Sequence, residues 1–87
     1  MKTIPQLEFQ LAAAEPGSEM YARTVEMLHH THVNVADWLT LAIDPVKLTN
    51  DALRSKLRTV KYHRAQAHFY LATLVAYWAE KDGLENS

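Results

Sequence analysis

The sequence contains no cysteine, and it has only two glycines and three prolines among its 87 residues. The lack of cysteine excludes disulfide bonds and thiolate metal sites, and it is compatible with a reducing compartment. Because glycine and proline are the strongest breakers of regular structure, their scarcity leaves long uninterrupted segments. None of these segments alternates apolar and polar residues with the period of a strand. The sequence therefore predicts an all-α protein.

Neither sign of charge dominates the chain. The formal net charge is −1, which predicts no general attraction to nucleic acid or to an anionic membrane. The first ten residues lack the apolar core of a secretory signal peptide. The longest apolar run falls short of the ~20 residues that a membrane-spanning helix needs. We expect a single domain, residues 1–87, that works in the cytoplasm and not in a membrane.

Capping residues divide the chain into three predicted helices. Pro5 suits the first turn of a helix, and Ser18 is a favourable N-cap. Asp44 and Pro45 have the residue types of an N-cap and a first helical position. The two long helices should form an antiparallel hairpin, with the short N-terminal helix packed at its open end. The predicted helices span residues 5–14, 19–43 and 45–82.

Both long helices carry an apolar stripe with alternating spacings of three and four residues, which is the heptad pattern of packed helices. Each stripe contains one polar member, His32 in the first and Arg64 in the second. Pairing Leu39 with Leu53 beside the turn places His32 opposite Val60. The predicted hairpin core comprises Tyr21, Val25, Leu28, His32, Val35, Leu39, Ala42, Leu53, Leu57, Val60, Ala67, Leu71, Leu74 and Trp78.

The short N-terminal helix is expected to set Leu7 and Leu11 against Leu74 and Trp78, beyond the end of the first long helix. It is too short to cover the remaining apolar surface, because residues 65–79 read AQAHFYLATLVAYWA and are apolar on every side of a helix. A helix of this kind must be buried all round. We therefore expect a protein partner, with the aromatic residues as anchors. The predicted partner-binding residues are Tyr62, Ala65, Phe69, Tyr70, Ala72, Ala76 and Tyr77.

Histidines cluster on the first long helix. Glu26 and His29 have the Glu-x-x-His spacing of carboxylate-bridged metal bundles, but the predicted stripes supply no inward carboxylates. His29 and His32 place no third ligand for a shared ion. We therefore expect no metal and no other cofactor, and we interpret His32 as a core histidine that sets the register. No nucleophile with a base and no phosphate-binding loop is visible, so we expect no catalytic residues and no enzymatic activity.

Two other functions deserve comparison. A basic run on the last helix suggests a small nucleic-acid-binding or regulatory protein, although acidic residues at Glu19, Glu26 and Asp37 can balance this charge across the hairpin, and we favour that interpretation. Alternatively, the apolar face closes a homodimeric four-helix bundle. The basic run consists of Arg54, Lys56, Arg58, Lys61 and Arg64.

The order of these features resembles a known family. The segments Gln6-Leu7-Glu8 and Gln10-Leu11, a long amphipathic helix, and Asp44-Pro45 before a second long helix are similar to the YscE/PscE/SsaE-like proteins of bacterial type III secretion. The resemblance implies a cytoplasmic helical hairpin that binds a tetratricopeptide-like chaperone. It also implies that the two proteins together keep the needle subunit soluble and unpolymerised. On this interpretation the chain is a non-enzymatic co-chaperone or adaptor.

Overall fold

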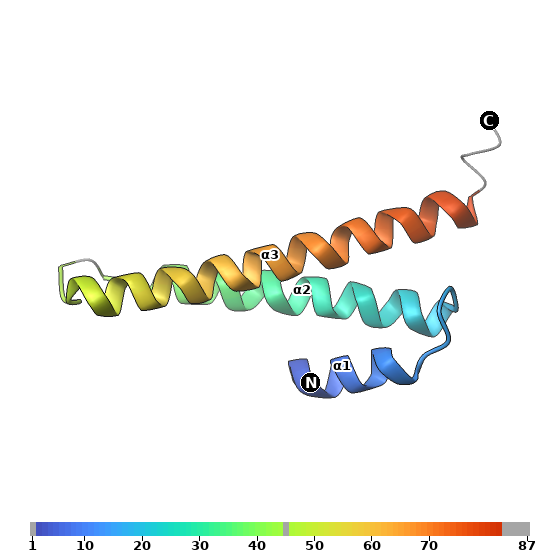
Figure 1. The fold of residues 1–87 in the computed structure, drawn as a ribbon, viewed down its shortest axis with the longest axis horizontal. Helices are drawn as coiled ribbons and strands as arrows, with labels where there is room; N and C mark the ends of the chain where they lie inside the picture. The colour runs from blue at the N-terminus through green and yellow to red at the C-terminus, as the bar shows by residue number, and fades with distance from the viewer. Residues whose placement is uncertain (1, 45, 83–87) are drawn as a thin grey trace.

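The protein is an antiparallel helical hairpin with a third, short helix beside it. The structure, a computed structural model, describes residues 2–44 and 46–82. The helices are α1 (Ile4–Ala13), α2 (Glu19–Ala42) and α3 (Asn50–Lys81). Within the described residues there is no strand, and Figure 1 shows α1 folded back along the N-terminal half of α2. The predicted fold class is therefore confirmed.

Local hydrogen bonds explain where α1 and α2 begin. Thr3 and Gln6 form a capping box, in which the Thr3 side chain accepts from the Gln6 amide and the Gln6 side chain accepts from the Thr3 amide. Ser18 Oγ accepts from the Tyr21 amide at 3.1 Å, as its predicted N-cap role requires. Gly17 has a φ of 82° in the turn before it, a conformation that favours glycine. The bounds of both helices agree with the prediction to within one residue.

The start of α3 differs from the prediction. Asp44 does not cap the helix, because its Oδ1 accepts from the Val46 amide at 3.0 Å and its carbonyl accepts from the Lys47 amide at 3.1 Å, within a turn. Thr49 is the N-cap instead, and its Oγ1 accepts from the Ala52 amide at 3.2 Å. The predicted helix start is therefore wrong, because residues 46–49 are not helical. Pro45 itself lies outside the described residues. The connection is consequently a loop and not a tight turn.

The core lies where the three helices meet. Leu7, Val25, Leu28 and Tyr70 form a buried cluster, with Leu28 fully inaccessible to solvent. One residue comes from α1, two from α2 and one from α3, so this single cluster holds all three helices together. Half-buried apolar residues pack around it: Ile4, Leu11, Tyr21 and Leu74.

The buried side of α3 is rotated relative to the predicted one. The predicted and the observed inner sides of α3 both contain Val60, Ala67 and Leu74. In the structure, His63 and Tyr70 occupy the inner positions that the prediction gave to Arg64 and Leu71. A buried arginine would have to lose its hydration, whereas here Arg64 lies at the surface, 3.2 Å from Asp37 Oδ1. Four predicted core residues are therefore exposed, and their core placement is wrong: Ala42, Leu57, Leu71 and Trp78.

The register of the hairpin also differs from the prediction. His32 is buried, as predicted, but its ring contacts His63 and Tyr70 and not Val60. Because α3 starts at Asn50 and not directly after Asp44, the connection from α2 is longer than predicted, and α3 is displaced along α2. The remaining predicted core residues are buried or half-buried: Tyr21, Val25, Leu28, Val35, Leu39, Leu53, Val60, Ala67 and Leu74.

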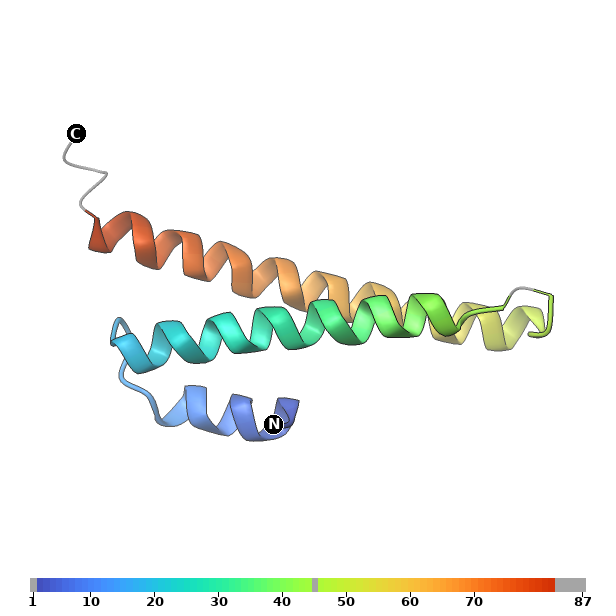
Figure 2. The same ribbon diagram turned by 180° about the vertical axis from the view of Figure 1, so that it is seen from behind.

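The backbone of α1 lies beside α2, while its side chains also reach the core residues Tyr70 and Leu74 of α3. Leu7 points into the core and is 1% exposed, and Leu11 lies beside it with Leu74 in the same cluster. The predicted contact with Trp78 is absent from the described core, because Trp78 is half exposed. Figure 2 shows the reason from behind, since α3 diverges from α2 and α1 toward its C-terminal end.

A polar contact fixes the orientation of α1 on α2. Thr24 is completely buried, and its Oγ1 accepts from Gln10 Nε2 at 2.7 Å while donating to the Met20 carbonyl at 2.8 Å. We expect Thr24→Val to lower the free energy of unfolding by about 1–3 kcal/mol, because the Gln10 amide loses its acceptor in a part-buried position. Urea denaturation of the two proteins measures this difference. An unchanged midpoint would show that α1 docks through apolar contacts alone.

Candidate partner-binding surface

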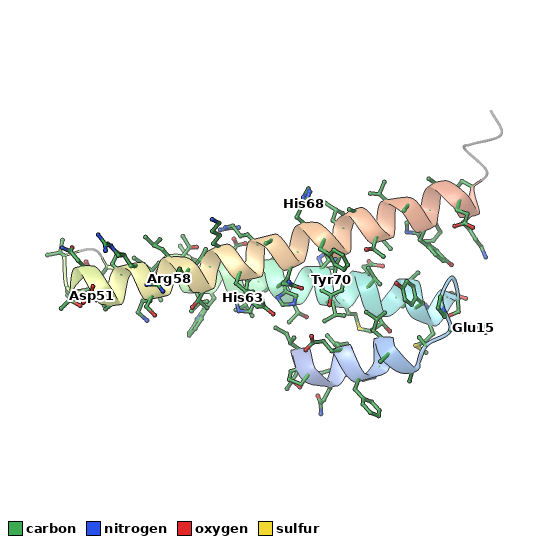
Figure 3. The ribbon with its side chains drawn as sticks, viewed as in Figure 1. Glu15, Asp51, Arg58, His63, His68 and Tyr70 are labelled. Atoms are coloured by element: carbon green, nitrogen blue, oxygen red, sulfur yellow. The ribbon has the colours of Figure 1, made fainter. Side chains whose placement is uncertain are left out.

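An exposed apolar stripe runs along α3 outside the core, and it borders α2 at Tyr62, whose ring lies edge-on to the His32 ring with the two centroids 6.3 Å apart. Phe69 is 61% exposed and Tyr62 is 54% exposed, although both are large and apolar. Figure 3 shows the geometry around them, with Tyr70 and His63 pointing toward α2 and His68 pointing away from it. We call this surface the outer stripe, and its members are Tyr62, Ala65, Phe69, Ala72 and Ala76, all of them exposed.

Two of the predicted partner-binding residues do not belong to the outer stripe. Tyr70 is 7% exposed and belongs to the core, so its predicted role as an exposed anchor is wrong. Its burial raises the pKa of the phenol, and the nearby Glu8 carboxylate acts in the same direction. Tyr77 is half-buried on the same side of α3 as Tyr70.

Sequence reasoning missed a neighbouring group of exposed apolar residues. Leu71, Val75 and Trp78 are 41%, 61% and 49% exposed, and they widen the apolar surface near the C-terminal end of α3. Leu71 and Trp78 were assigned to the core because their spacing fits a heptad as well as the true inner residues do. The only contrary signal was Arg64 in the same predicted stripe, a charge that a core rarely holds.

A second exposed apolar area lies on α2. Trp38 is 68% exposed and Leu41 is 87% exposed. Between Trp38 and the N-terminal end of α1 there is an open groove of about 700 Å³. The groove is lined by Lys2, Leu7, Met27, His30, Thr31, Asn34, Val35 and Trp38.

Three of the histidines contact one another or the backbone. His32 Nδ1 lies 2.8 Å from His63 Nδ1, and His29 Nδ1 lies 2.8 Å from the Ala67 carbonyl. Because a carbonyl only accepts, His29 must carry its proton on Nδ1 in this contact. Among the described residues, no three His, Cys, Asp or Glu side chains are placed to hold a metal ion.

The buried histidine has an altered pKa. Burial lowers the pKa of His32, and the neighbouring His63 lowers it further, while Glu8 on α1 has the opposite effect. The short distance between the two Nδ1 atoms requires that one of them donates and the other accepts. The pair therefore holds α2 and α3 in register most effectively when at least one of the rings is neutral.

The basic run is partly matched by acidic residues. Arg64 contacts Asp37 on α2, and its guanidinium also lies 3.4 Å from Thr40 Oγ1. Arg54, Arg58 and Lys61 are exposed around Leu57, near the N-terminal end of α3. The predicted charge balance across the hairpin thus applies to Arg64, and the other basic residues remain on the surface.

None of the helices in residues 2–44 and 46–82 combines the length and the hydrophobicity that crossing a membrane demands. Neither protein-family models, nor characterised proteins, nor solved structures give a match to this chain.

Proposed function

We propose that the protein is a non-enzymatic helical adaptor that binds a helical partner protein through the outer stripe of α3. The observation that carries this proposal is that Phe69 and Tyr62 are more than half exposed on a helix whose opposite side is held in the core. A monomeric protein rarely exposes a continuous apolar surface of this kind, and such surfaces mark binding sites. Large aromatic side chains on a preformed helix are suitable anchors for a hydrophobic groove.

The chemistry of the stripe favours a partner made of helices. Ala65, Ala72 and Ala76 are small, so the backbone of a partner helix can approach α3 closely between the aromatic residues. Helix-in-groove binding uses anchors spaced by three, four and seven residues, which is the spacing of this stripe. The resemblance to the type III secretion hairpins gives the partner a class, a tetratricopeptide-like chaperone. With that chaperone, the protein would help to keep a needle subunit soluble, in the cytoplasm.

The test is the replacement of Phe69 by aspartate. Because Phe69 is exposed, the Phe69→Asp protein should remain as helical as the parent by circular dichroism. It should lose roughly 2 kcal/mol or more of binding free energy, as for the loss of a central anchor, which weakens binding about 30-fold or more. The measurement is capture of partners from the organism of origin by the tagged parent and variant, with identification by mass spectrometry and titration of the purified partner.

Leu41→Asp is the matched control, because Leu41 is a still more exposed apolar residue on α2. The control should capture the same helical-repeat protein as the parent does. If Phe69→Asp retains that partner with unchanged affinity, the outer stripe is not the binding surface. If the parent captures no helical-repeat protein, the proposed class of partner is wrong.

A further inference from the structure

The outer stripe has a regular internal pattern. Ala65 and Ala72 of the stripe, and Ala79 further along α3, follow one another at intervals of seven residues, which is one full heptad. The other heptad position of the stripe carries Tyr62, Phe69 and Ala76, so its aromatic residues lie at one end and in the middle. Ala65, Ala72 and Ala76 are exposed and Ala79 is half-buried. The backbone of α1 lies beside α2, and its core side chains Leu7 and Leu11 are grouped with Tyr70 and Leu74 rather than with the outer stripe.

This pattern is complementary to itself when a second α3 runs in the opposite direction. In an antiparallel helix pair, a residue at one heptad position faces a residue at the other heptad position of the second helix. Each layer of the interface therefore contains one residue of the Tyr62 series and one of the Ala65 series. Placing Phe69 beside Ala72 of a second copy also places Tyr62 beside Ala79 and Ala65 beside Ala76. Every layer then contains at least one alanine, and no aromatic residue meets another. The two helices can approach closely along the whole stripe.

Charge complementarity supports the same register. The positions that flank the layers bring Lys61 of one copy beside Asp82 of the other, and the two-fold symmetry repeats this pair at the opposite end. Arg58 of one copy and Glu80 of the other lie about one helical turn apart near each end of the paired stripes. A parallel arrangement would instead bring Lys61 beside Gln66 of the second copy, so it would not form the Lys61–Asp82 pair. Opposite charges that flank helix pairs set partner choice and orientation.

We infer that two copies of this chain associate through their outer stripes, with the α3 helices antiparallel and Phe69 packed against Ala72 of the second copy. The inference rests on the proposed function, because it uses the same surface. It adds that the surface is occupied by a second copy when the helical partner is absent. The partner must then displace that copy, so that its binding and the formation of the dimer compete.

The test uses charge reversals at two exposed residues outside the core. Lys61→Glu and Asp82→Lys each replace two attractive pairs in the dimer with two repulsive ones. Because each reversal turns both pairs of the symmetric dimer from attractive to repulsive, each variant should dimerise about tenfold or more weakly than the parent. The double variant should recover the affinity of the parent. An equimolar mixture of the two single variants should also recover it, because the mixed dimer restores both pairs. Sedimentation equilibrium of the purified proteins measures each of these affinities.

Two results would overturn the inference. A parent protein that stays monomeric from micromolar to millimolar concentration does not form this dimer. A dimer that is insensitive to the single reversals, or that is not restored in the mixture, uses another register or another surface. Neither result touches the proposed function, which is judged separately by whether Phe69→Asp loses the helical-repeat partner. Conversely, a dimer with the expected charge behaviour stands even if no such partner is captured.

Discussion

Replacing Leu28 with alanine is expected to lower the free energy of unfolding by about 2–5 kcal/mol. Leu28 is fully buried in the one cluster that joins α1, α2 and α3. The substitution removes apolar contacts with Leu7, Val25 and Tyr70 and leaves a cavity that a rigid helix pair fills only in part. Because small domains are stable by about 5–15 kcal/mol in total, this one change removes a large share of the stability.

Urea denaturation followed by circular dichroism measures the effect. Leu41→Ala is the control, because it deletes the same atoms from an exposed position of α2. We expect the control to change the stability by no more than about 0.5 kcal/mol. Equal losses in the two variants would contradict the three-helix core, since they would mean that burial of Leu28 contributes nothing.

The stability of the parent protein should fall as the pH drops below about 6.5, the ordinary pKa of histidine. Burial and the neighbouring His63 lower the pKa of His32 in the folded state. The unfolded chain therefore takes up a proton at a higher pH than the folded protein does, and protonation favours unfolding. The stability linked to His32 is complete above the unfolded pKa and is lost as the pH falls from there toward the lower folded pKa. The charged and titratable groups near the ring are Glu8 on α1, and His63, Tyr62 and Tyr70 on α3.

His32→Leu should make the stability nearly independent of pH between roughly pH 5 and 7. At pH 8 the variant loses the hydrogen bond to His63 and gains apolar burial, so we expect a net change within about 1 kcal/mol. At pH 5 it should be more stable than the parent. The urea midpoints of both proteins across this range provide the measurement, with His68→Gln as the control, because His68 points away from α2 (Figure 3). A variant that keeps the pH dependence of the parent would show that another group is responsible.

Local chemistry in the sequence was sufficient for most helix boundaries. Ser18 and the turn at Gly17 mark the start of α2, and Thr3 and Pro5 begin α1 through bonds among neighbouring residues. The start of α3 was ambiguous because Asp44 and Thr49 are both good N-cap residues only a few positions apart. Which of them caps the helix depends on the length of loop that the packed hairpin requires, and this is not a local property.

The sequence by itself determined that the protein is all-α, that two long helices form a hairpin, and that apolar surface exceeds what the chain can bury. These follow from periodicity, caps and the scarcity of breakers, which act over a few residues. Only the tertiary structure decided which side of α3 is inside. Because this helix is apolar all round, Leu71 and Tyr70 are equally consistent with its period. Two contacts between α2 and α3 determine the inner side. His32 of α2 packs against His63 and Tyr70 of α3, and Arg64 of α3 stays at the surface beside Asp37 of α2. The same packing left Phe69 and the alanines of the outer stripe on the surface.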